Sequence, residues 1–273
     1  MTITVFTSAW NCIDAGLVSL VDYYLNFLKV DKFIYADNYS TDDTIKILKR
    51  KFKGDKRLVI MNTPYVTFSD NDVCALANKL YEEDTNEAFI WVDSDEIVYH
   101  PDLRQYLLDK KKVGKYFISS LLVNVYNTTD TFNDNINILD NFEMCNEIPV
   151  QKSPIIIRSK DHDIRFHGGH HCISVGDVLM EWSTKDRNLL DDIAIFHFCY
   201  ITPDFFNKRK TLPANHLLKQ GAMFAAISPG GWWLLDGATR QEWARVERSS
   251  SVTKQDFLKN RNIIFTLQTK NSL

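Results

Sequence analysis

Two aspartates separated by one residue, directly after a short apolar run, are the residues of this sequence best suited to chemistry. The run 89–92 has the composition of a buried β-strand, and Asp93, Asp95 and Glu96 follow it. Ligands of open α/β sheets bind at the carboxyl ends of the strands. Carboxylate oxygens there predict a site for a hard divalent cation, Mg²⁺ or Mn²⁺, with a diphosphate.

The same triplet also fits a polar turn that simply leaves a strand, so its meaning depends on the surrounding elements. Helices and strands alternate over the first hundred residues. We expect strands at 3–8, 32–36, 57–61 and 89–92, and helices at 15–29, at 45–51 and after a capping Ser69. Strands that alternate with helices require crossover connections and therefore a parallel, doubly wound sheet.

The alternation weakens after Pro101. We expect a helix at 103–108, strands at 116–125, 154–158 and 193–198, a long polar loop at 127–141, and helices at 204–227 and 239–248. A histidine-rich segment, 167–171, lies between the last two strands. The chain is therefore predicted to be an α/β domain with a C-terminal helical extension.

Composition excludes several classes of partner. The 273 residues are 45% hydrophobic and 25% charged, and a net charge of −3 predicts no affinity for nucleic acid or an anionic membrane. Five cysteines without a Cys-x-x-Cys pair argue against a disulfide framework. No apolar run reaches the ~20 residues of a transmembrane helix, and the N-terminus lacks signal-peptide features. We expect a cytoplasmic protein of unknown oligomeric state.

A second polar loop, residues 37–44, follows the second expected strand and reads Asp-Asn-Tyr-Ser-Thr-Asp-Asp-Thr. This loop and the Asp-Ser-Asp-Glu segment together resemble the GT-A glycosyltransferases, in particular their family 2-like branch. That branch has an Asp-Asn-x-Ser-x-Asp-x-Thr loop and an Asp-x-Asp motif, often followed by Glu. His197, with Phe205 and Lys208, resembles a third element of the branch. The similarity covers most of residues 2–210.

The resemblance implies a GT-A fold and a metal-dependent transfer of a sugar with inversion, as in that branch. The donor would be a UDP-, GDP- or dTDP-sugar, and the acceptor would be a hydroxyl of a glycan or of another molecule. Residues 1–100 would be the nucleotide-sugar-binding half, 101–202 the acceptor-binding half of the same domain, and 203–273 the helical extension. By resemblance, Asp37 would accept from the nucleobase. The metal ligands would be Asp93, Asp95 and His197, and an imidazole favours Mn²⁺ over Mg²⁺. The other donor-binding residues would be Thr7, Ser8, Ala9, Asn38, Ser40, Asp93, Ser94 and Lys208.

The sequence departs from the branch at two points. Asn11 is followed by Cys12, where the branch has Glu, so that nucleotide contact is not carried over. No residue matches the motif of the catalytic base that an inverting enzyme needs. The candidates in the second half of the chain are Glu143, His170, Asp191 and Asp192.

Two other functions remain open from the sequence. A metallohydrolase would use His167, His170, His171 and His197 with the two aspartates, and would need a closed histidine cluster with a metal-bound water. A non-catalytic nucleotide-sugar-binding module would keep the fold without the chemistry. Both aspartates and His197 are present, which argues against the second alternative.

Overall fold

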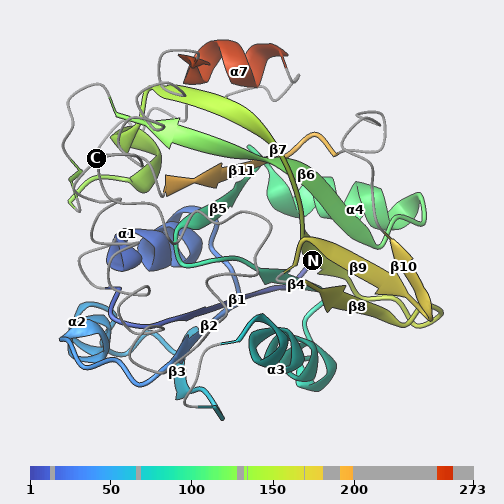
Figure 1. Cartoon of the computed structure of the whole chain (residues 1–273), viewed down its shortest axis with the longest axis horizontal. Helices are drawn as coiled ribbons and strands as arrows, with labels where there is room; N and C mark the ends of the chain where they lie inside the picture. Colours follow the sequence, from blue (N-terminus) through green and yellow to red (C-terminus); the bar gives the residue numbers. More distant parts are fainter. Residues whose placement is uncertain are drawn as a thin grey trace.

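The structure, a computed structural model, describes residues 1–12, 16–65, 69–127, 132–133, 135–168, 170–180, 191–198 and 251–260. In these residues a nine-stranded sheet has the order β3-β2-β1-β4-β7-β6-β11-β5, and β12 pairs with β7 (Figure 1). The strands are β1 (Ile3–Ala9), β2 (Lys32–Asp37), β3 (Leu58–Asn62), β4 (Ala88–Trp91), β5 (Glu96–Tyr99), β6 (Phe117–Tyr126), β7 (Met144–Ile157), β11 (Ala194–His197) and β12 (Val252–Thr253).

The first half is the parallel, doubly wound unit that the alternation predicts. β3, β2, β1 and β4 are mutually parallel, and they alternate with α1 (Leu17–Asp22), α2 (Thr44–Lys51) and α3 (Asp70–Glu83). Ser69 caps α3 as expected, since its hydroxyl oxygen accepts from the Asp72 backbone amide at 3.1 Å. The expected α/β fold class is therefore confirmed.

The first helix differs from the expected uninterrupted helix 15–29. After Asp22 the chain continues as a π-helical turn, η2 (Tyr23–Phe27). The buried hydroxyl groups of Tyr23 and Tyr24 both reach Val98 of β5, bonding its carbonyl at 2.9 Å and its amide at 3.0 Å. These bonds join the first helix to β5, the strand that follows the loop of Asp93 and Asp95, called the acidic loop below.

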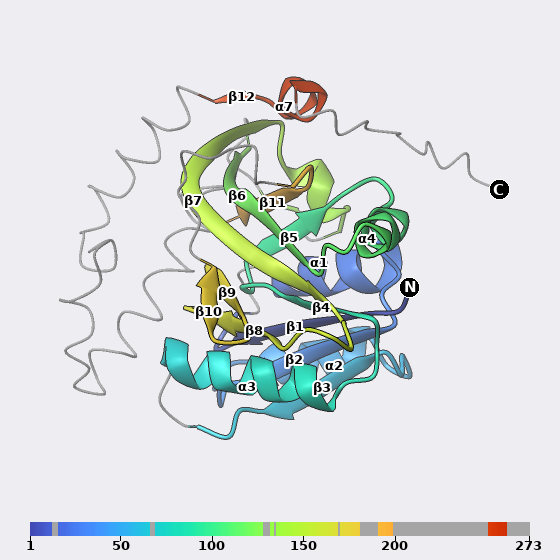
Figure 2. The ribbon, with the colours of Figure 1, turned by 90° about the vertical axis from the view of Figure 1, so that its right-hand side faces the viewer.

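Two apolar clusters cover the two faces of the sheet. The larger cluster packs α1, η2, α2 and α4 (Leu103–Lys112) against one face, with Leu17, Leu48 and Leu107 fully buried. The smaller cluster packs α3 and the short strands β8 (Ile164–His167) and β9 (Cys172–Val175) against the other face, around Phe89 and Trp91. Figure 2 shows β8 lying above α3. Both faces of β4 are therefore buried, which explains its unbroken apolar run.

The second half of the sheet is mixed, and its strands differ most from the sequence expectation. β7 has fourteen residues and bends across the molecule from β12 to β4 (Figure 2), whereas only 154–158 was predicted. Its first part carries polar residues such as Asn146 and Lys152, which interrupt the apolar pattern of a strand. The three-stranded sheet of β8, β9 and β10 (Val178–Met180) was not predicted.

The expected C-terminal helices 204–227 and 239–248 lie outside the described residues. The described part of that region contains β12 and α7 (Lys254–Asn260), whose Phe257 and Leu258 are buried against the larger cluster. Across the described ranges, no helix has the length and apolarity to cross a bilayer.

Candidate functional site

The carboxyl ends of β1, β2 and β4 bring the two motif loops to one edge of the sheet. The chain adds β2 and β3 on one side of β1 and then places β4 on the other side, so the strand order reverses between β1 and β4. This reversal creates the crevice in which doubly wound proteins bind ligands. Ala9 lies beside Asp37 in register, and Phe6 lies beside Trp91, two residues before Asp93.

The loop that begins at Asp37 is held from within and from the β1 loop. The Asp37 carboxylate is buried and accepts from the Ser40 backbone amide at 3.0 Å. Asn11 fixes the loop in place. Its side-chain oxygen accepts from the Thr41 backbone amide at 2.7 Å, and its backbone amide donates to the Ser40 hydroxyl at 2.9 Å. Asn11 has a left-handed backbone, φ 49°, which asparagine tolerates better than most residues. The fixed loop holds Asp37 at the edge of the crevice.

The other residues expected near a nucleoside lie at this same edge. Thr7 and Asn38 are buried there, and Ser8 lies between Thr7 and Ala9 on β1. The Asn38 side-chain oxygen accepts from the Thr63 hydroxyl at 3.0 Å, while its amide nitrogen has no hydrogen-bond partner within the described ranges. Ser94 is buried, and its hydroxyl oxygen lies 3.8 Å from the Cys12 sulfur. Cys12 of the β1 loop thus contacts the loop that carries Asp93 and Asp95.

His197 of β11 comes back to the acidic loop from the far half of the sheet. Its Nε2 lies 3.4 Å from a carboxylate oxygen of Asp95, and its Nδ1 lies 2.8 Å from the side-chain oxygen of Asn124. An amide oxygen only accepts, so Nδ1 donates to Asn124, and Nε2 is the ring nitrogen that faces Asp95. Phe196 and Phe198 both pack on Phe142, as expected from alternation along a strand.

The sheet places His197 in a row of polar residues. In register, Glu96 of β5 lies beside His197, His197 beside Asn124 of β6, and Asn124 beside Asn146 of β7. Side chains of residues directly opposite in neighbouring strands point to the same face. Four polar residues from four strands therefore share one face of a sheet whose other residues are largely apolar.

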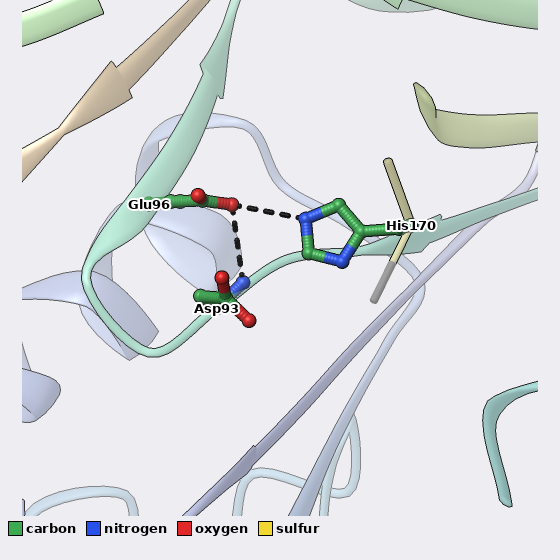
Figure 3. Close-up of side chains that lie close together, drawn as sticks. All are labelled: Asp93, Glu96 and His170. Carbon is green, nitrogen blue, oxygen red and sulfur yellow. Dashed lines mark hydrogen bonds and ion pairs between the residues drawn. The ribbon is translucent and has the colours of Figure 1, made fainter. Parts of the chain in front are cut away.

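A second group surrounds Glu96 (Figure 3). The Glu96 carboxylate accepts from His170 Nε2 at 3.1 Å and from the Asp93 backbone amide at 3.3 Å. Lys152 of β7 bridges the acidic residues, with its ammonium 3.0 Å from Asp93 and 3.1 Å from Glu96. The antiparallel pairing of β4 with β7 brings it there, since Ile90 faces Ile155 one residue before β4 ends.

Burial and charge act in opposite directions on this group. Burial favours the neutral acid at Glu96, but the Lys152 ammonium and the His170 hydrogen bond outweigh it and lower the pKa of the carboxyl. Burial also opposes the charge on Lys152, but Asp93 and Glu96 raise the pKa of the ammonium above its ordinary value. Both groups are therefore charged at neutral pH, and they compensate each other in the interior.

His167, His170, His171 and His197 do not form the closed cluster that a metallohydrolase would need. His167 Nε2 contacts the Ser174 hydroxyl at 3.0 Å, and His171 Nδ1 contacts the Gln151 carbonyl at 2.9 Å. His170 is fully buried, and its ring lies 4.8 Å from that of Trp91. Among the described residues, the group near enough to share a metal contains one histidine, with Asp93, Glu96 and His170.

The candidate bases lie in different places. Asp191 is buried at the opposite edge of the sheet, where Lys110, Lys115 and the Ser119 backbone amide bind its carboxylate at 3.1, 2.7 and 3.0 Å. His170 is closed off by Glu96 and Trp91. Glu143 is exposed just before β7. Asp192, which follows Asp191 in the chain, is also exposed. Asp191 therefore has a structural role that accounts for its burial.

Sequence reasoning missed Lys152 and Asn124. Each is a polar residue within a strand, Asn124 in the apolar run Leu121-Leu122-Val123-Asn124-Val125 and Lys152 in the stretch of β7 that was not predicted. A polar residue that interrupts a buried strand is the signal that could have indicated them. Lys208, expected near the diphosphate, lies outside the described residues.

Asp95 and His197, two of the expected metal ligands, lie together, and Asp93 belongs to the neighbouring group with Glu96 and His170 that is close enough to share a metal. His197 Nε2 and a carboxylate oxygen of Asp95 face each other at 3.4 Å, and either a proton on Nε2 or a cation between the two atoms stabilises such a pair. The Asp93 side chain is 49% exposed, so this carboxylate is open to a ligand. Nitrogen and oxygen ligands together suit Mn²⁺.

Among known proteins, the chain is similar only to solved structures in the comparisons made. No protein-family model and no curated protein matches the chain. TarS of S. aureus is similar over 49% of this chain and 23% of that chain, at 17% identity and a TM-score of 0.32. TarS 1–349 in complex with UDP-GlcNAc is similar over 46% of this chain and 34% of that chain, at 17% identity and a TM-score of 0.32. This chain thus spans about a quarter to a third of those chains, and we base its function on its own residues.

Proposed function

We propose that this chain is a metal-dependent glycosyltransferase of GT-A type, related to the family 2-like branch, that transfers a sugar from a nucleotide sugar to an acceptor hydroxyl with inversion. The observation that carries the proposal is the approach of His197 to Asp95 within 3.4 Å. These residues come from opposite halves of the chain, and both belong to motifs of that branch. A histidine with a purely structural role has no need of a carboxylate at the carboxyl edge of the parallel strands.

Each motif has a role that its surroundings support. Asp37, held by the Ser40 amide, would accept hydrogen bonds from the nucleobase. Thr7, Ser8, Ala9, Asn38 and Ser94 would line the nucleoside. Asp93, Asp95 and His197 would hold Mn²⁺, with Mg²⁺ as the alternative. The bound cation would neutralise charge that develops on the departing diphosphate. Glu143 and Asp192 are the base candidates that the structure leaves exposed.

The proposal is tested by thermal unfolding with UDP, GDP and dTDP, each with and without Mn²⁺. One nucleotide should stabilise the chain chiefly when Mn²⁺ is present, because the cation links carboxylates and diphosphate. A ligand at 100 times its dissociation constant adds roughly 2.7 kcal/mol to the free energy of unfolding. Tightly held zinc in the purified protein, with no response to any nucleotide, would instead support a hydrolase.

Asp95→Asn is the variant that belongs to this experiment, because an amide lacks the negative charge that the cation requires. It should lose the Mn²⁺-dependent stabilisation and more than nine tenths of the transfer rate, a loss above ~1.4 kcal/mol in transition-state stabilisation. Asp177→Asn, at an exposed turn before β10, is the matched control and should behave as the wild type. An Asp95→Asn variant with full Mn²⁺-dependent nucleotide binding would remove Asp95 from the site.

A further inference from the structure

Lys152 is the one described lysine whose ammonium is nearly excluded from solvent between two carboxylates of the candidate site. Its side chain is 5% exposed, and it contacts Asp93 at 3.0 Å and Glu96 at 3.1 Å. The two partners differ in environment. Glu96 is 1% exposed and also bound to His170, whereas the Asp93 side chain is 49% exposed. The ammonium thus joins a fixed, buried carboxylate to an open one.

We propose that Lys152 is a positioning residue that occupies Asp93 in the cation-free site and so makes cation binding depend on the diphosphate. This inference rests on the proposed function, in which Asp93 is a metal ligand. An ammonium hydrogen-bonded to a carboxylate oxygen competes with a cation for that oxygen, and its charge repels the cation as well. A divalent cation alone therefore meets a site whose charge is already partly compensated.

A diphosphate changes this balance. It brings negative charge and further oxygen ligands, so that Lys152 and the cation no longer compete for a single open carboxylate. Glu96 keeps the ammonium at the site, because that carboxylate is fixed by His170 and by the Asp93 backbone amide. Nucleotide and cation are then expected to increase each other's affinity by an equal factor.

The test measures Mn²⁺ binding by electron paramagnetic resonance, first without nucleotide and then with saturating UDP, GDP or dTDP. Lys152→Met keeps the length of the side chain and removes its charge. It should bind Mn²⁺ without nucleotide at least tenfold more tightly than the wild type, and the further gain on adding nucleotide should shrink by a similar factor. Lys110→Met is the matched control, because it removes the same charge from a buried carboxylate, Asp191, that keeps Lys115.

Loss of Lys152 alone leaves Glu96 without its ammonium partner, so a second pair of variants keeps the test sound. Lys152→Met/Glu96→Gln removes both buried charges, and it should bind free Mn²⁺ at least tenfold more tightly than Glu96→Gln. Circular dichroism verifies the fold of each variant. If the wild type binds Mn²⁺ with nucleotide but neither comparison shows tighter binding, the role of Lys152 is refuted and the proposed function stands. If the wild type binds no Mn²⁺ with any nucleotide, both fail.

Discussion

Single residues define the proposed cation site through their hydrogen bonds. Asn124 directs the ring of His197, because its side-chain oxygen accepts from Nδ1 at 2.8 Å and leaves Nε2 toward Asp95. Residues that orient a metal-binding histidine in this way affect metal affinity without touching the metal. Lys152 acts on Asp93 from the other side. The donor set is thus held by residues outside the two sequence motifs.

Asn124→Ala should weaken nucleotide-supported Mn²⁺ binding by about 10- to 100-fold, because His197 loses the acceptor that fixes its tautomer and orientation. Asn124→Asp retains an oxygen acceptor at the same position and should restore most of the affinity. Titration calorimetry with Mn²⁺ and saturating nucleotide measures both. Equal loss in the two variants would indicate a packing role for Asn124 and would count against the orientation of His197 described above.

At the level of elements, the two ends of β6 and β11 have different roles. The carboxyl end carries Asn124 and His197 beside the acidic loop. The amino end carries the buried Asp191, which joins α4 to the sheet through Lys110 and the Ser119 backbone amide. Asn124 lies five residues further along β6 than Ser119, which corresponds to a distance of about 16 Å along the strand at the usual rise per residue. A single strand pair thus positions the site at one end and anchors a helix at the other.

Asp191→Ala should lower the free energy of unfolding by about 3 kcal/mol, because two lysines and a buried backbone amide lose their acceptor. Its effect on Mn²⁺-dependent nucleotide affinity should be small, since the carboxylate lies at the far end of the strands. Asp192→Ala, at the neighbouring exposed position, should change stability by under ~0.5 kcal/mol. Urea unfolding gives the stabilities. A loss of transfer in a fully stable Asp191→Ala protein would return Asp191 to the list of bases.

For the whole molecule, one sheet joins the two halves of the chain. β4 pairs with β1 on one side and with β7 on the other, so the expected boundary near residue 100 crosses a continuous sheet. The site has the same property, because Asp95 comes from the first half and His197 from the second. Donor binding and folding are therefore expected to need both halves.

A fragment of residues 1–100 should not fold on its own, because it exposes the edge of β4 and leaves β5 without β11. An exposed apolar edge strand favours association. Size-exclusion chromatography and far-ultraviolet circular dichroism compare this fragment with 1–202 and with the full chain. A monomeric 1–100 fragment with cooperative thermal unfolding would show that the first half is an independent domain.

The sequence by itself determined the parallel half of the sheet and the positions of its two polar loops. The spacing of apolar residues along 3–92 is a local property, and alternating strands and helices permit few topologies. That topology alone puts Asp37 and Asp93 at one edge. Only the tertiary structure decided that Lys152 meets Asp93 and that Asn124 meets His197, the residue that the resemblance had placed with Asp95. Lys152, Asn124 and His197 come from distant strands, and the polar residues of β7 hide that strand from a pattern based on burial, because their partners lie far along the chain.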